Sequence, residues 1–92
     1  MQITVEYAAQ LKRAAGVASE SVDLDEPSTF SQLLERVADK HGDPLRGLLF
    51  DENDRVHPSL LLFLGDEQIR GDASIELSDG DVVSLLTPIS GG

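Results

Sequence analysis

The sequence predicts a small α+β domain in which one mixed sheet packs against one main helix. Short apolar–polar alternations predict strands near both ends of the chain, and an apolar stripe with helical spacing predicts a helix between them. The expected order is strand, strand, helix, strand, short strand, strand. A helix that follows a hairpin can cover one face of a mixed sheet, and this arrangement gives two layers.

The first two strands are expected to form a hairpin. Residues 2–7 alternate between polar and apolar side chains, which is the period of a half-buried strand. Residues 21–24 repeat the alternation and are expected to form the return strand. Segment 8–17 between them contains good helix formers but reaches Gly16, so it is expected to be a short helical turn or a loop.

The main helix is expected to begin after Thr29. Its hydroxyl can accept a hydrogen bond from a free backbone N–H group, and Gln32 stands three residues further on, as in a capping box. Gly42 is a suitable C-terminal cap, and Pro44 prevents the helix from continuing. Apolar residues recur at helical spacing and form one stripe for the core: Phe30, Leu33, Leu34, Val37 and Ala38.

The second half of the chain is less regular. Residues 45–50 are expected to add one or two helical turns, and the acidic stretch 51–54 a solvated turn. A short strand is expected at 67–70. A Ser-Asp-Gly-Asp turn at 78–81 then precedes a last strand at 82–86.

The run Leu60–Leu64 is continuously apolar, as expected of a strand that is covered on both faces. One face is expected to pack on the helix, whereas the other needs a cover or a partner. Segment 43–59 could fold over that second face. The alternation alone does not decide which residues of the run face outward.

The amino-acid composition limits the kinds of partner that the protein can bind. The chain has 92 residues, enough for one domain, with 7 basic and 17 acidic residues and a net charge of −10. This charge argues against binding to nucleic acid, which requires a basic surface, and against binding to anionic membranes. It favours a partner with a basic face, although solubility alone is an equally good explanation.

The side chains offer no convincing catalytic or metal site. Cysteine is absent, which excludes disulfides, thiolate ligands and a cysteine nucleophile. His41 and His57 lack a ligand spacing, and the acidic stretch 51–54 lacks the glycine and distal glutamate of a calcium loop. No serine stands in a Gly-x-Ser-x-Gly motif. The N-terminus does not resemble a signal peptide, and no apolar run is long enough to span a bilayer, so a cytoplasmic protein is expected.

The C-terminus is the most informative segment. Pro88 locks φ and so fixes the direction in which the tail leaves the last strand. Gly91 and Gly92 lack a Cβ atom, so their backbone can pass through a channel too narrow for side chains. The terminal carboxylate is then open to attack a nucleotide phosphate. A frayed end with incidental glycines is the alternative interpretation.

The segment Leu77–Gly92 resembles the end of the sulfur-carrier family that includes the small subunit of molybdopterin synthase and the thiamine sulfur carrier. An acidic Asp-Gly-Asp turn is followed by an apolar strand, a proline and a small-residue tail that ends in Gly-Gly. The first strand, the helix and the strand–turn at 61–66 fall in matching order. The resemblance implies a β-grasp domain over residues 1–88, with the first and last strands adjacent at the sheet centre, and a flexible tail over residues 89–92.

The resemblance also implies a chemistry. In the family, an E1-like enzyme uses ATP and magnesium to adenylate the terminal carboxylate, here that of Gly92. A sulfur donor then displaces AMP, and the resulting thiocarboxylate delivers sulfur inside a synthase subunit. Gly91 would be the spacer that fits both partner channels, and the carrier itself would bind no cofactor and supply no catalytic side chain. Partner-binding positions would be Pro88, Ile89 and Ser90 in the tail and Leu61 or Phe63 on the helix-free face of the sheet.

Several readings of the function remain open. The segment before Leu60 is longer than in the thiamine carriers, so the chain resembles the carriers for molybdopterin or cysteine synthesis more closely. A protein modifier joined to lysines through Gly92 shares the activated intermediate. A plain interaction domain with an inert tail is the remaining hypothesis. Molybdopterin synthesis is the favoured prediction.

Overall fold

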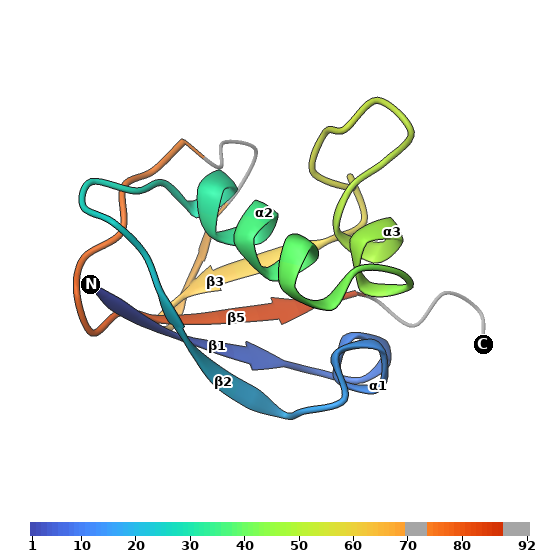
Figure 1. The fold of residues 1–92 in the computed structure, drawn as a ribbon, viewed down its shortest axis with the longest axis horizontal. Coiled ribbons are helices and arrows are strands. Elements are labelled where there is room, and N and C mark those ends of the chain that lie inside the picture. Colours follow the sequence, from blue (N-terminus) through green and yellow to red (C-terminus); the bar gives the residue numbers. More distant parts are fainter. Residues whose placement is uncertain (70–73, 88–92) are drawn as a thin grey trace.

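The computed structural model describes residues 1–69 and 74–87, which form a five-stranded sheet with helices packed against one face (Figure 1). The strands follow the order β2-β1-β5-β3-β4. The elements are β1 (Gln2–Tyr7), α1 (Gln10–Ala15), β2 (Ser19–Asp23), α2 (Phe30–His41), α3 (Leu45–Leu49), β3 (Leu61–Leu64), β4 (Glu67–Ile69) and β5 (Val82–Leu86).

The first and last strands lie side by side at the centre of the sheet. β1 and β5 run parallel, with Val5 opposite Val83, whereas the three other strand pairs are antiparallel. This mixed sheet with one main helix across it is the β-grasp arrangement, so the predicted fold class and the predicted neighbours at the sheet centre are confirmed.

The main helix has the predicted N-terminal cap. The Gln32 backbone N–H donates to the Thr29 hydroxyl at 3.2 Å, and the Thr29 N–H donates to the Gln32 side chain at 2.7 Å. Gly42 ends α2 with a positive φ of 67° and donates its N–H to the Ala38 carbonyl. All five residues of the predicted apolar stripe are buried, so the stripe attaches the helix to the sheet.

The turn at Ser78–Asp81 holds β5 against β1. Gly80 adopts a φ of 87°, a conformation that other residues rarely take. Its N–H donates to the Gln2 carbonyl at 2.8 Å, while the Gln2 N–H donates to the Asp79 carboxylate at 2.7 Å. The Thr4 N–H donates to the Asp81 carbonyl at 3.0 Å. The predicted acidic turn therefore fixes the position of β5 beside β1.

The expectation that the Leu60–Leu64 run is covered on both faces is wrong. Leu60 and Leu62 are buried, but Leu61, Phe63 and Leu64 are only half-buried. Leu62 lies opposite Leu85, which is fully buried, so the neighbouring residue Phe63 points to the other face of the sheet. The helices cover only one face at this strand (Figure 1).

Segment 43–59 does not cover the helix-free face either. Its residues 45–49 form α3, as predicted, and this short helix packs against α2 and α1. Leu45, Leu49 and Phe50 belong to the same core as the α2 stripe. The predicted polar turn at 51–54 closes through a hydrogen bond from the Asp54 N–H to the Asp51 carbonyl. This whole segment therefore extends the helical layer (Figure 1).

The first connection also contains a helix, because residues 10–15 of the uncertain segment 8–17 form α1. Gly16 ends this helix with a φ of 81°. Figure 1 shows α1 and α3 at the end of the sheet where β5 finishes. None of the helices in the described part of the chain is long and apolar enough to cross a membrane.

Candidate functional site

The C-terminal segment follows β5, a central strand of the sheet. β5 pairs with β1 on one side and with β3 on the other. Just beyond β1, the Ala8 N–H donates to the Leu85 carbonyl at 3.2 Å. Thr87 is the last described residue, and its buried hydroxyl has no hydrogen-bond partner among the described residues. The site at this end of the sheet therefore lies on a strand that is hydrogen-bonded on both sides.

An apolar patch lies on the helix-free face of β5 and its neighbour β3. The pairings place Leu61 opposite Leu86 and Phe63 opposite Ser84, all on the face away from α2. Val82 shares this face and is 38% exposed, which is high for a large apolar side chain. We call this set the free-face patch; it consists of Leu61, Phe63, Val82 and Leu86.

Polar groups interrupt the free-face patch at one point. The Ser84 hydroxyl donates to the Glu6 carboxylate at 3.1 Å across the β1–β5 pair. A shallow hollow runs from Phe63, Ser84 and Leu86 toward Ala18 in the loop before β2. The face thus offers a partner an apolar centre with one exposed carboxylate beside it.

A cluster of charged and polar groups fastens the helix-covered face at the same end of the sheet. The Glu20 carboxylate in β2 accepts hydrogen bonds from the Tyr7 hydroxyl and from Lys40 Nζ, both at 2.5 Å. The Nε2 atom of His41 lies 2.6 Å from the same carboxylate. Three elements, β1, β2 and the last turn of α2, meet at this one side chain.

The environment of Glu20 favours its charged form. Burial acts to raise the pKa of the Glu20 carboxyl, but hydrogen bonds from Lys40, Tyr7 and His41 outweigh this effect and lower the pKa to about 2. Burial, together with the nearby carboxylate, raises the pKa of the Tyr7 hydroxyl. A carboxylate that stays charged and a phenol that stays neutral hold a structural contact and are not arranged for proton transfer.

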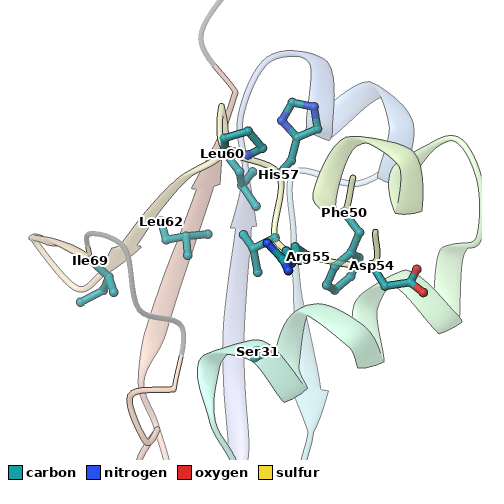
Figure 2. Close-up of a pocket in the computed structure, with 10 residues that line it drawn as sticks. Ser31, Phe50, Asp54, Arg55, His57, Leu60, Leu62 and Ile69 are labelled. Atoms are coloured by element: carbon teal, nitrogen blue, oxygen red, sulfur yellow. The ribbon is translucent and has the colours of Figure 1, made fainter. Parts of the chain in front are cut away.

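A second hollow lies on the helix-covered side of the sheet, away from the free-face patch (Figure 2). Leu62 of β3 and Ile69 of β4 line it together with apolar side chains of the connecting segments, and Arg55 and His57 stand in the loop beside it. The Ser59 N–H donates to His57 Nδ1 at 3.1 Å, so this ring nitrogen accepts a hydrogen bond within its own loop. No group of three side chains that could hold a metal ion occurs within residues 1–69 and 74–87. The lining is Ser31, Phe50, Asp54, Arg55, Val56, His57, Pro58, Leu60, Leu62 and Ile69.

The structure brings two of the predicted site residues together. Leu61 and Phe63 share the free-face patch beside β5. The five predicted tail positions, Pro88, Ile89, Ser90, Gly91 and Gly92, lie outside the described residues.

Sequence reasoning missed three residues of this face: Val82, Ser84 and Leu86. Their alternation with buried Val83 and Leu85 was visible in the sequence. It could have placed them on one face together, but the pattern does not say which face the helix covers.

Comparisons with known proteins agree with this architecture. The β-grasp fold is shared with the class of ubiquitin-like sulfur carriers. The chain belongs to the ThiS family, whose model matches residues 5–92.

Individual relatives cover the full length of the chain. It is 29% identical to the molybdopterin synthase sulfur carrier subunit of Chlamydomonas reinhardtii over 100% of both chains. Among solved structures, SAMP1 from Haloferax volcanii has a TM-score of 0.87 at 22% identity, with 100% of both chains covered. A chain of the BexX/CysO complex of Amycolatopsis orientalis has a TM-score of 0.71 at 25% identity, with 98% of this chain and 99% of that chain covered.

Proposed function

We propose that the chain carries sulfur on the carboxylate of Gly92, as a thiocarboxylate that an E1-like enzyme generates and a synthase subunit consumes. The observation that carries this proposal is the position of the Gly-Gly terminus. Gly92 comes five residues after Thr87, which directly follows the central strand β5, and β5 contributes Val82 and Leu86 to the free-face patch. Membership of the ThiS family supports the same assignment.

The proposed reaction has two steps. A carboxylate oxygen of Gly92 attacks the α-phosphate of ATP, so that pyrophosphate leaves and an acyl-adenylate forms. A sulfur nucleophile then attacks the acyl carbon and AMP departs, which leaves sulfur in place of one oxygen. Magnesium and ATP are bound by the activating enzyme, so the carrier acts as a co-substrate without catalytic side chains. A reaction that consumes ATP fits the cytoplasm.

The length of the tail suits this role. Five residues extend at most about 17 Å, so Gly92 can enter a partner's active site only if the domain itself docks close to the entrance. The free-face patch provides a surface for that docking, because it is apolar and adjoins β5. The absence of side chains on Gly91 and Gly92 allows the last two residues to fit a narrow channel.

The receiver of the sulfur in this proposal is a molybdopterin synthase, since a relative at 29% identity is named a molybdopterin synthase sulfur carrier subunit. A carrier for cysteine or thiamine synthesis uses the same terminus and the same activation. These pathways differ in the enzyme that accepts the thiocarboxylate. Reconstitution with a large molybdopterin synthase subunit, followed by an assay of sulfur transfer, distinguishes them.

The first experiment is deletion of Gly92. We expect the deletion to abolish carrier-dependent exchange of pyrophosphate into ATP by the activating enzyme, while the thermal melting temperature stays unchanged because the residue lies beyond the last strand. A variant with one alanine added after Gly92 is the matched control, because it keeps every residue but moves the carboxylate. Exchange by either variant at the wild-type rate would contradict the proposal, and loss of folding on deletion would contradict the assignment of the tail.

A protein modifier is the second candidate, because the chain also resembles the small archaeal modifier protein 1 of Haloferax volcanii in fold, with a TM-score of 0.86. A modifier would be joined through Gly92 to lysine side chains of other proteins. Mass spectrometry of digested cell extract would then find lysines that carry a remnant of the carrier's C-terminus. Their absence in cells that make the thiocarboxylate would leave the sulfur carrier as the function.

A further inference from the structure

The chain contains few groups that could form a stable amide with an activated carboxyl group. An amine can do so, whereas an arginine guanidinium stays protonated in proteins and does not attack an acyl carbon. The sequence has two lysines, Lys12 and Lys40, in addition to the α-amino group of Met1. These three amines are therefore the candidate acceptors within the chain for the activated carboxyl group of Gly92.

Two of the three amines are engaged by the fold. Lys40 Nζ donates to the Glu20 carboxylate at 2.5 Å, and the Met1 ammonium group donates to the Leu24 carbonyl at 2.7 Å. Each must give up a hydrogen bond before its nitrogen can attack an acyl group. Lys12 is exposed, and its side chain makes no hydrogen bond or ion pair within residues 1–69 and 74–87. Lys12 is thus the amine that is free to react.

Lys12 also lies at the end of the domain where β5 finishes. The Ala8 N–H, just beyond β1, donates to the Leu85 carbonyl of β5 at 3.2 Å. The Leu11 N–H in turn donates to the Ala8 carbonyl at 3.1 Å, and Lys12 is the next residue. Two hydrogen bonds therefore connect the helix α1, which carries Lys12, to the end of β5, and Figure 1 shows the two elements together at this end of the sheet.

The chain beyond Thr87 is long enough to bring Gly92 to Lys12. Thr87 comes two residues after Leu85, and the steps from Thr87 through Leu85 and Ala8 to Lys12 come to about 20 Å. Five residues extend up to about 17 Å, and the lysine adds a four-carbon stem, so together they cover this separation.

Charge favours a reaction within one molecule over a reaction between two copies. Each copy has a net charge of −10, so two carriers repel each other. A group on a short tether has an effective concentration on the order of millimolar at a site that the tether can reach. The terminus of the same chain therefore meets Lys12 more often than the terminus of a second copy does.

We propose that Lys12 captures the activated Gly92 of its own chain when no sulfur donor removes the adenylate; this inference rests on the proposed function. The Nζ lone pair of the neutral amine attacks the acyl carbon of the Gly92 adenylate. The bond from that carbon to the AMP oxygen breaks, AMP leaves with the electron pair, and the nitrogen releases a proton to solvent. The product contains an amide bond between Lys12 and Gly92, and its mass is lower than that of the carrier by one water molecule.

The closed product cannot carry sulfur. Its Gly92 has no free carboxylate, so the activating enzyme cannot adenylate it again. Capture by Lys12 thus withdraws carrier molecules that are activated when sulfur is not supplied, while a sulfur donor that reacts first yields the thiocarboxylate.

The test is the intact mass of the carrier after incubation with ATP and the activating enzyme, without a sulfide source. We expect wild type to lose one water molecule, and fragmentation should locate the new bond between Lys12 and Gly92. Lys12→Arg keeps the positive charge but removes the amine, so the loss of water should disappear. Lys40→Arg makes the same change at the engaged lysine and should behave like wild type. Pyrophosphate exchange should stay within about twofold of wild type for both variants, because both substitutions conserve charge on the surface.

The possible results separate this inference from the proposed function. Wild-type carrier that supports no exchange would refute the proposed function, and this inference with it. Exchange without any loss of water, or an undiminished loss in Lys12→Arg, would refute capture by Lys12 and leave the proposed function standing. A covalent dimer would show that the attack occurs between copies, and a bond at Lys40 or Met1 would show that another amine reacts; either result would overturn the inference. Equal melting temperatures of the three proteins exclude a folding defect as the cause.

Discussion

The two faces of the sheet contain similar apolar residues but differ in what these residues do. On β5, Leu85 is fully buried beneath the helices, whereas its neighbour Leu86 is half-buried on the other face. On β3, Leu62 is 6% exposed while Phe63 is half-buried. Residues of the helix-covered face form the buried core, whereas the free-face patch is an apolar surface that no helix covers. Apolar residues on the first face determine stability, and those on the second are available to a partner.

The largest expected effect comes from a pair of substitutions one residue apart. Leu85→Ala should lower the free energy of unfolding by about 2–5 kcal/mol, because it leaves a cavity in a close-packed core. Leu86→Ala should lower it by less than about 1 kcal/mol, since that side chain is already partly in water. Urea denaturation of both variants measures the difference. Equal losses would mean that the two faces do not differ as described.

The next effect concerns the charged cluster on the covered face. The pKa of Glu20 is lowered to about 2 in the folded protein, compared with 4.5 for a free side chain. Glu20 therefore stabilises the fold fully above pH 4.5, and this contribution of about 3 kcal/mol is lost as the pH falls toward 2.

The matched variant for this contribution is Glu20→Gln, which cannot ionise. We expect it to be less stable than wild type by about 2–3 kcal/mol at pH 7 and to approach wild-type stability near pH 2. Urea denaturation across this pH range gives the comparison. A stability difference that stays constant over the whole range would show that the charge of Glu20 is not the source.

Phe63→Ala tests the opposite property, binding without a contribution to the core. We expect kcat/KM for carrier activation to fall about tenfold, corresponding to about 1.4 kcal/mol of lost binding to the activating enzyme. Ser21→Ala, on the helix-free face of the edge strand β2, is a control outside the patch. Normal activation of the Phe63 variant would show that the free-face patch does not bind the activating enzyme.

The smallest effect is expected at Thr87, on the covered face. Its buried hydroxyl has no hydrogen-bond partner among the described residues, so no group in that part of the chain offsets the cost of its burial. Thr87→Val replaces the hydroxyl with a methyl group of similar size. We expect a gain of about 1 kcal/mol in the free energy of unfolding, measured by urea denaturation. A loss of stability would indicate that the hydroxyl has a partner after all.

Local signals allowed much of the fold to be predicted. The Thr29–Gln32 capping box, the α2 stripe and the turn at 78–81 each depend on residues close in sequence, and each is present in the structure. The Leu60–Leu64 run was harder, because apolar side chains at every position conceal which residues face the helix. The pairing with β5, 19 to 25 residues further along the chain, decides that question.

The candidate site was predictable only in part, for the same reason. Leu61 and Phe63 could be named from the sequence, but the patch also needs residues of β5 in register with them. The Glu20 cluster joins residues 7, 20 and 40–41. These positions are far apart in the sequence, so no short motif predicts their contact. The predictions for the tail depend on chemistry at Gly92, which lies outside the described residues.

The most direct test of the central claim is the intact mass of the carrier after incubation with ATP, the activating enzyme and a sulfide source. The account predicts a mass gain equal to the exchange of one oxygen for one sulfur, localised to Gly92 by fragmentation and absent without ATP. An unchanged mass, with an activating enzyme shown to be active on another carrier, would contradict the sulfur-carrier function.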